Sequence, residues 1–321
     1  MLSERSESKD LHPDLQRCTE LIDAPGANFL LLLAVYLTRG TDMLWKDNGR
    51  SSNLEDGRGS SGFGGRGGMG IGGTAVLLIL SLIFGRNFFS DVGGSTVTQS
   101  NGTLSPADSA REEPEVRFVS FVLDDAQQTW AKTLPQFGAE YHDAKLHLFR
   151  GATDTGCGTG ESAMGPFYCP TDEKVYIDLE FYDELKTKFA AAGDFAQAYV
   201  IAHELGHHVQ HILGTDAKMR QMAQRDPSQQ NELSVKLELQ ADCYAGVWGH
   251  STQQRSILQQ GDIEEGLTAA AAVGDDRMQS RATGRVNTDT FTHGSSAQRV
   301  SWFKKGFDTG DPRACDTFGS R

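Results

Sequence analysis

The sequence predicts an α+β domain that is mostly helical, contains a small antiparallel sheet and is preceded by one transmembrane helix. Three observations lead to this fold class. Residues 69–85 contain no charged side chain. Short segments between residues 144 and 179 alternate apolar and polar side chains, which is typical of strands. Most of the chain from residue 194 onward repeats apolar side chains at helical spacing.

The composition limits the classes of partner that the protein is expected to bind. The chain has 321 residues, which suits one or two domains with a sizeable core. Its formal net charge is −13 at pH 7, and its isoelectric point is about 5.1. A phosphate backbone is bound by a basic surface, and no long run of lysine and arginine occurs in the sequence. The composition therefore argues against a nucleic-acid partner.

The apolar run predicts a membrane anchor at residues 69–89. A bilayer-spanning helix needs about 17–25 apolar residues, and Asn87, Phe88 and Phe89 extend the run past Arg86. A buried core helix and a cleaved signal peptide are the alternatives, but the flanks are polar and Gly-rich, and no small-x-small cleavage site follows.

Basic residues predict the orientation of this anchor. Those that precede the run are Lys46, Arg50, Arg58 and Arg66. After Arg86, no basic residue follows until Arg111. The positive-inside rule therefore predicts a single-pass protein with a cytoplasmic N-terminus and a periplasmic or otherwise extracytoplasmic domain.

Residues 1–42 form a doubtful leader. Their apolar segment, residues 28–37, is too short to span a bilayer. Met43 begins a polar segment that suits a cytoplasmic start. Our hypothesis is that translation starts at Met43 and that residues 1–42 correspond to upstream sequence that is not translated.

Two polar segments flank the anchor. Residues 43–68 become rich in glycine and serine, and we expect them to be a disordered cytoplasmic segment. Residues 90–114 have the composition of a linker. The globular domain is then expected at residues 115–321.

Within the domain, apolar spacing and turn residues predict an order of elements. A helix begins near Val116 and ends before Pro135. Three strands follow, at residues 144–149, 165–169 and 174–179. The remaining predicted helices cover residues 181–192, 194–212, 229–248, 262–274 and 295–307.

The segment "AYVIAHELGHHVQHILG" carries four histidines within nine positions. His203 and His207 are i and i+4, so both imidazoles lie on one helix face and can bind one zinc ion. Glu204 is rotated about 100° from His203, which places it to take a proton from metal-bound water. An alternative is a helix with satisfied or exposed histidines. A third histidine ligand further along this helix is excluded because Leu213 occupies its position.

A later helix offers a carboxylate as the third protein ligand. In "KLELQADCYAG", Glu238 and Asp242 are again i and i+4. We expect Glu238 to bind zinc and Asp242 to accept a hydrogen bond from the far nitrogen of a ligand histidine. A solvated helix face is the alternative, but the neighbours are mostly apolar. His208 and His211 are assigned to no metal; we expect His208 at the surface or behind the ligands.

Taken together, these segments resemble the predicted neutral zinc metallopeptidases of bacteria. The resemblance rests on the two motifs above, on "ESAMGPFYCPTDEKVYIDLEFYDEL" and on "THGSSAQRVSWFKKGFDTGD", and it covers Met43 to about Phe318. It implies a membrane-anchored zincin-like domain of the gluzincin type, one zinc ion per chain, and hydrolysis of a peptide or protein substrate.

The resemblance also implies roles for single residues. His203, His207 and Glu238 would be the zinc ligands, and Glu204 the catalytic base. A gluzincin also needs a donor for the oxyanion of the transition state, for which His293 and Tyr176 are candidates. Strand 174–179 would be the edge that aligns an extended peptide.

Four cysteines lie in the expected domain and allow three pairings. We favour Cys157–Cys169, which closes a short Gly-rich loop, and by elimination Cys243–Cys315. Free buried cysteines are the alternative, and a cytoplasmic domain would favour them.

Two other functions stay open. One is a non-catalytic, zinc-stabilised module for binding or assembly in the cell envelope, although such a site has no need of Glu204. The other is a zinc hydrolase that acts on cell-wall peptides or amides. The sequence makes no prediction about the oligomeric state.

Overall fold

The computed structural model describes residues 42–59, 105–189 and 191–319. The described residues belong to one compact unit. The predicted anchor at residues 69–89 lies outside the described residues, as does the doubtful leader apart from Asp42. Within the described ranges, no helix combines the length and the apolar character needed to cross a bilayer.

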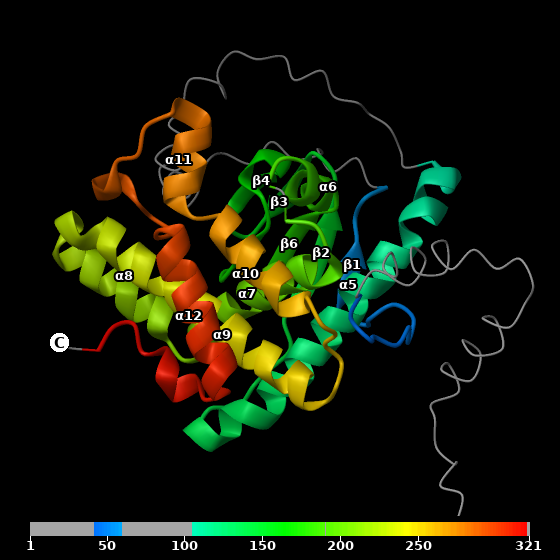
Figure 1. Cartoon of the computed structure of the whole chain (residues 1–321), viewed down its shortest axis with the longest axis horizontal. Coiled ribbons are helices and arrows are strands. Elements are labelled where there is room, and N and C mark those ends of the chain that lie inside the picture. Colours follow the sequence, from blue (N-terminus) through cyan, green and yellow to red (C-terminus); the bar gives the residue numbers. More distant parts are fainter. Residues whose placement is uncertain (1–41, 60–104, 190, 320–321) are drawn as a thin grey trace, which may run out of the picture. The chain divides into compact units, whose positions relative to one another are not determined.

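Helices make up most of the unit (Figure 1). In chain order, the α-helices are α5 (Pro106–Thr133), α6 (Glu180–Thr187), α7 (Asp194–Ile212), α8 (Thr215–Arg225), α9 (Gln230–Gln254), α10 (Asp262–Ala272), α11 (Asp275–Thr283) and α12 (Ser296–Thr309). The short helices α8 and α11 were not predicted, because both are strongly polar and show no apolar stripe.

The larger sheet has the strand order β1-β2-β6-β5. Its strands are β1 (Leu54–Asp56), β2 (Lys145–Phe149), β6 (Lys174–Asp178) and β5 (Phe167–Cys169). Only β5 and β6 pair antiparallel, whereas β1–β2 and β2–β6 are parallel. The sheet is therefore mixed, and the prediction of an antiparallel sheet is wrong for two of its three pairs.

Two further sheet features differ from the prediction. A separate hairpin, β3 (Ala152–Thr155) with β4 (Gly158–Glu161), fills the connection between β2 and β5. Strand β6 lies inside the larger sheet, so β5 rather than β6 is the edge strand at this end.

Residues 43–59 are part of the folded unit, which corrects the prediction of disorder for this part of residues 43–68. Met43 is buried, and Trp45 packs edge-on against Phe118 of α5 with ring centroids 5.4 Å apart. Arg58 is also buried, where it pairs with Asp56. The polar composition did not reveal this order, because the few apolar side chains of the segment pack against the distant domain and Arg58 also pairs with Glu112 of α5.

The pairing of β1 with β2 bears on the predicted membrane topology. Hydrogen-bonded neighbours in one sheet lie on the same side of any membrane, so residues 43–59 share a side with the domain. A single crossing at residues 69–89 would separate them. A cytoplasmic segment 43–59 and an extracytoplasmic domain therefore cannot both hold.

Helix α5 begins earlier than predicted, so residues 105–114 are not linker. The Ser105 side chain caps the helix by accepting a hydrogen bond from the Asp108 amide, and Pro106 occupies the first turn, where proline is tolerated. Pro114, which suggested a linker, lies inside the helix.

Helix α7 lies at the centre of the core, in contact with α5, α9, α10 and the sheet. Val175 and Ile177 of β6 belong to the same buried cluster as α7. On the other side, α9 and α12 pack at close range: a Cβ atom on Gly306 would lie 1.9 Å from the Cys243 carbonyl oxygen. Helices α9 and α12 are therefore closely packed.

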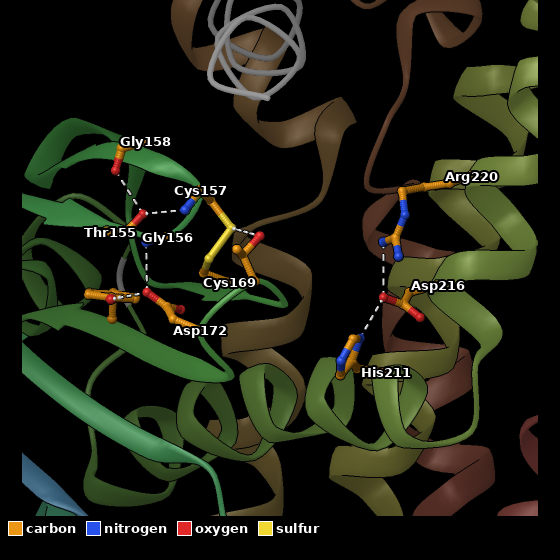
Figure 2. The surroundings of a disulfide bond; sticks show 11 residues. Thr155, Gly156, Cys157, Gly158, Cys169, Asp172, His211, Asp216 and Arg220 are labelled. Carbon is orange, nitrogen blue, oxygen red and sulfur yellow. Dashed lines mark hydrogen bonds and ion pairs between the residues drawn. A yellow bond between two sulfur atoms is a disulfide. The ribbon is translucent and has the colours of Figure 1, made fainter. Parts of the chain in front are cut away.

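Both favoured disulfides are present. Cys157–Cys169 joins the β3–β4 turn to β5, with Cα atoms 5.9 Å apart (Figure 2). Cys243–Cys315 ties the C-terminal segment to α9, with Cα atoms 5.5 Å apart. The two bridges flank the helix pair that carries the predicted metal ligands.

Candidate metal centre

Helix α7 presents two histidines on one face. Asp194 occupies its first turn, and Gly214 follows its end in the left-handed conformation with φ +71°. Between these ends, His203 and His207 stand one turn apart, with ring centroids separated by 4.9 Å. Their spacing therefore produces the shared face that the sequence predicts.

Helix α9 brings Glu238 to this face. One carboxylate oxygen of Glu238 lies 3.2 Å from Nε2 of His203, and the other lies 3.5 Å from Nε2 of His207. One donor atom from each of the three residues falls within 4.8 Å of the others. Two imidazole nitrogens and a carboxylate oxygen are ligands that zinc commonly takes in catalytic sites.

The far nitrogens of both histidines are held by hydrogen bonds. Nδ1 of His203 lies 2.9 Å from Oδ1 of Asp242, and Nδ1 of His207 lies 2.8 Å from Oε1 of Gln210. Acceptors at Nδ1 favour the tautomer with its proton there, which leaves each Nε2 lone pair toward Glu238. The residues present thus fit a zinc ion.

Asp242 is fully buried and has a dense set of partners. Arg299 of α12 donates from Nε to Oδ2 and from Nη2 to Oδ1, both at 2.9 Å. The hydroxyl of Tyr199, one turn before His203 on α7, also donates to Oδ1. A buried carboxylate needs such compensation, and here it is supplied by α7 and α12 together.

The electrostatic field at the three ligands favours positive charge. Burial lowers the pKa of His203, but Asp242 and Glu238 outweigh burial and raise the pKa to about 9. Burial opposes ionisation of Glu238, but the imidazoles of His207 and His293 hold its pKa well below the ordinary value. A field that retains a proton between carboxylates also favours a divalent cation there.

Glu204 is buried beside the ligands. Its carboxylate makes no hydrogen bond to any residue that the structure describes. Burial raises the pKa of Glu204, and His203 and His207 offset part of this effect. Its position next to His203, rather than its pKa, makes it the candidate for taking a proton from water.

His293 lies close enough to Glu238 for each to shift the pKa of the other. It belongs to the loop before α12, whose Gly294 packs against Leu239 of α9. Asp275 holds this loop by accepting the backbone amides of residues 292–294 at 2.7–2.9 Å. Nδ1 of His293 lies 3.3 Å from the other oxygen of Asp275. The loop therefore fixes this imidazole near the candidate site.

Tyr176 does not join this group. Its side chain stacks on Phe167 with ring centroids 5.0 Å apart, and its hydroxyl donates to Asp172 at 2.6 Å. It belongs to a small apolar cluster with Phe149 and Cys169, separate from the cluster that contains α7. Alternation along β6 explains the error: Val175 and Ile177 face α7, so Tyr176 faces away.

The other two histidines of the segment point away from the ligands. His208 is fully buried rather than at the surface, between the Tyr168 hydroxyl at 2.9 Å and the His142 carbonyl oxygen at 2.7 Å. Burial lowers its pKa to about 4. His211 lies at the helix end, where its Nδ1 is 2.9 Å from Asp216 (Figure 2).

Sequence reasoning missed four residues that hold the site: Tyr199, Gln210, Asp275 and Arg299. Tyr199 stands four residues before His203 and so shares its face, which was a usable signal. Arg299 gives no clear local signal, because its neighbours Gln298 and Ser301 are polar as well. Asp275 gives no local signal, because its partners lie 17–19 residues away.

Comparison with known proteins places the chain in a family. A family model described as "Putative neutral zinc metallopeptidase" matches residues 43–318. Uncharacterized protein YpfJ of Escherichia coli K12 is 50% identical over 286 residues, which cover 86% of this chain and 99% of that protein. Uncharacterized protein Rv2575 of Mycobacterium tuberculosis H37Rv is 46% identical over 202 residues, 60% of this chain and 66% of the relative. No solved structure matches. Because the family model covers most of its length, this chain belongs to the neutral zinc metallopeptidase family.

Proposed function

We propose that the protein hydrolyses peptide bonds with one zinc ion held by His203, His207 and Glu238. The observation that carries the proposal is the convergence of these donor atoms from two helices. The buried carboxylate of Glu204 lies beside them and has no hydrogen-bond partner among the described residues. A purely structural zinc site has no use for that buried carboxylate. Its presence favours hydrolysis over a non-catalytic binding or assembly module.

Each residue has a chemical task in this proposal. When bound, zinc polarises a carbonyl group and lowers the pKa of water toward about 7. Glu204 takes a proton from the attacking water and delivers it to the leaving amine. His293, anchored by Asp275, donates a hydrogen bond to the oxyanion of the transition state. Asp242 and Gln210 keep His203 and His207 in the tautomer that can bind metal.

The substrate would be an extended peptide laid along the edge strand β5. Strand β5 contacts α7, and among the described strands it pairs only with β6. Peptides commonly bind such edges by adding a strand. Peptides and amides of the cell wall present the same bond, so they belong to the same proposed class.

We place the domain outside the cytoplasm, because both disulfides join cysteines that a reducing compartment would keep apart. Residues 43–59 then lie outside as well.

The test compares the full chain with two variants. Zinc per chain is measured by elemental analysis, and cleavage is measured on an unfolded fluorescent protein substrate. We expect about one zinc in the parent, loss of zinc in Glu238→Ala, and retention of zinc in Glu204→Gln with cleavage lower by about 10²–10⁴-fold.

Three results would count against the proposal. A folded parent that takes up no zinc would remove the metal site. A zinc-loaded Glu204→Gln protein that cleaves as fast as the parent would remove the proposed base. Zinc binding without cleavage of protein or cell-wall peptides would favour the binding module.

A further inference from the structure

A second group of carboxylates lies at the start of helix α7. Asp194 is the first residue of α7, and Asp262 and Glu265 belong to the first turn of α10. One oxygen from each of the three side chains falls within 4.8 Å of the others. Gly193 makes this approach possible, because a Cβ atom there would lie 2.0 Å from the Glu265 carboxylate.

These carboxylates are short of hydrogen-bond donors. Asp262 is fully buried; its Oδ2 accepts the Gln259 amide at 2.7 Å, but its Oδ1 has no partner in the described part of the chain. Oδ1 of Asp194 is likewise buried and unpaired there. Among the described residues, Glu265 accepts a hydrogen bond from the Phe195 amide alone, at 3.2 Å. Unpaired buried carboxylate oxygens are costly, so the group calls for a cation.

The backbone nitrogen of Met43 lies against this group. It donates to Oδ2 of Asp194 at 2.8 Å. The Met43 side chain is buried in the main core, and the Leu44 amide donates to the Ile257 carbonyl oxygen at 2.7 Å. The buried Met43 side chain and the hydrogen bond of the Leu44 amide therefore both hold this nitrogen in place.

In a chain that continues upstream, this nitrogen is an amide with one proton, and Asp42 adds a further negative charge. Burial is the largest cause that raises the pKa of Asp194, Asp262 and Glu265, and Asp42 raises each of them further. In a chain that begins at residue 43, Asp42 is gone. The same nitrogen then becomes an ammonium with three protons and a positive charge.

We propose that Asp194, Asp262 and Glu265 form a binding site for the α-ammonium group of a chain that begins at Met43. The ammonium group replaces one fixed hydrogen bond by an ion pair with several carboxylates, and it supplies the donors that their oxygens lack. The family model also begins its match at residue 43, and YpfJ is covered over 99% of its length by 86% of this chain.

The site couples the beginning of the chain to the helix of the metal ligands. Asp194 opens α7, and His203 lies on the same helix. A seated ammonium group fixes the entry of α7 and the start of α10 together. The inference does not depend on zinc binding or hydrolysis, and its tests do not use activity.

The first experiment identifies the N-terminus of the protein isolated from its natural host. Free α-amines are labelled before digestion, and the labelled peptides are read by mass spectrometry. We expect a free amine on Met43. A natural N-terminus anywhere upstream would overturn the proposal.

The second experiment compares full chains that begin at Met43, at Met43 behind a Gly-Ser extension, and at Met1. We expect a melting temperature higher by about 5 °C or more for the first, because an unpaired buried charge costs several kcal/mol. Asp194→Asn and Asp262→Asn should lower it in that chain and have little effect in the extended ones. Equal effects in all three chains would overturn the proposal.

A matched control and a chemical readout complete the design. Asp183→Asn removes an exposed carboxylate from the first turn of α6 and should act equally in all chains. Acylation of the Met43 α-amine should be about tenfold slower, or more, in the parent than in Asp194→Asn, since an ion pair raises the pKa of the amine. Saturable binding of Ca²⁺ alone, lost in Asp262→Asn and independent of the chain start, would show a metal site instead.

Discussion

Helix α7 carries two groups of ionisable side chains that differ in how their charges are compensated. In the middle of the helix, the far nitrogens of His203 and His207 and the carboxylate of Asp242 all have hydrogen-bond partners. At its beginning, oxygens of Asp194 and Asp262 have none among the described residues. The first group is therefore pre-organised for a cation. The second lacks hydrogen-bond donors among the described residues.

The difference shows how a buried charge is made tolerable. Asp242 is compensated by Arg299, which the packing of α9 against α12 delivers at a fixed position. Asp194 and its neighbours have no such cation in α10 or α7. Their compensation depends on which atom occupies the place of the Met43 nitrogen.

The largest expected effect comes from breaking the compensated group. Arg299→Met leaves the buried carboxylate of Asp242 without its arginine partner, and we expect a loss of about 3–5 kcal/mol in unfolding free energy. Chemical denaturation of the zinc-free protein measures it. The control is Arg220→Met, which breaks an ion pair with Asp216 of the same 2.9 Å length, but Arg220 is half exposed. That change should cost no more than about 1 kcal/mol. Similar losses for both variants would contradict this account.

The sequence predicted the compensated group better than the uncompensated one for a physical reason. His203 and His207, like Glu238 and Asp242, are i and i+4 pairs on helices, so local spacing alone places them on one face. Asp194 lies about 70 residues from Glu265 and about 150 from Met43, and only the folded chain brings these atoms together. Nothing in the local sequence around Asp194 reveals this.

The fold follows the same division. Helix α7 has the bounds that were predicted, Asp194–Ile212, whereas α9 continues six residues past its predicted end, to Gln254. Strand β1 was missed because its three residues, Leu54–Asp56, carry two acidic side chains and pair with β2, about 90 residues later in the chain. The missed strand and the wrong prediction of disorder for residues 43–59 therefore share one cause, a long-range contact of an N-terminal segment.

Asp242→Asn tests how much the hydrogen bond to His203 contributes to metal binding. We expect zinc affinity to fall by about 10–100-fold, because an amide can accept the Nδ1 proton but provides no charge. Competition with a chelator measures it. Asp216→Asn is the matched control, since Asp216 lies equally 2.9 Å from Nδ1 of His211, which holds no metal (Figure 2). An equal loss of affinity in both variants would refute the role of Asp242.

A pH series tests the carboxylates at the start of α7. In the chain begun at Met1, the pKa is raised to about 6 for Asp194 and to about 7 for Glu265, with burial as the main cause. An acid with a raised folded-state pKa favours folding below its unfolded-state pKa, and this stability is lost as pH rises through the folded-state value. The melting temperature of this chain should fall, relative to one begun at Met43, between about pH 4 and 7. A constant difference across this range would contradict the ammonium site.

The smallest effect concerns two buried tyrosines, one inside the compensated group and one outside it. The Tyr199 hydroxyl donates to Asp242, so Tyr199→Phe removes one of several donors to that carboxylate and should cost about 0.5–1.5 kcal/mol. Tyr182 of α6 is buried too, but its hydroxyl has no partner among the described residues. Tyr182→Phe removes an unsatisfied group and should leave stability unchanged or slightly higher. Both changes delete the same atom from a buried ring. The difference between the two changes in unfolding free energy therefore reports on the hydrogen bond. If Tyr199→Phe were as harmless as Tyr182→Phe, the carboxylate of Asp242 would owe its stability to Arg299 and His203, and the hydroxyl would be dispensable.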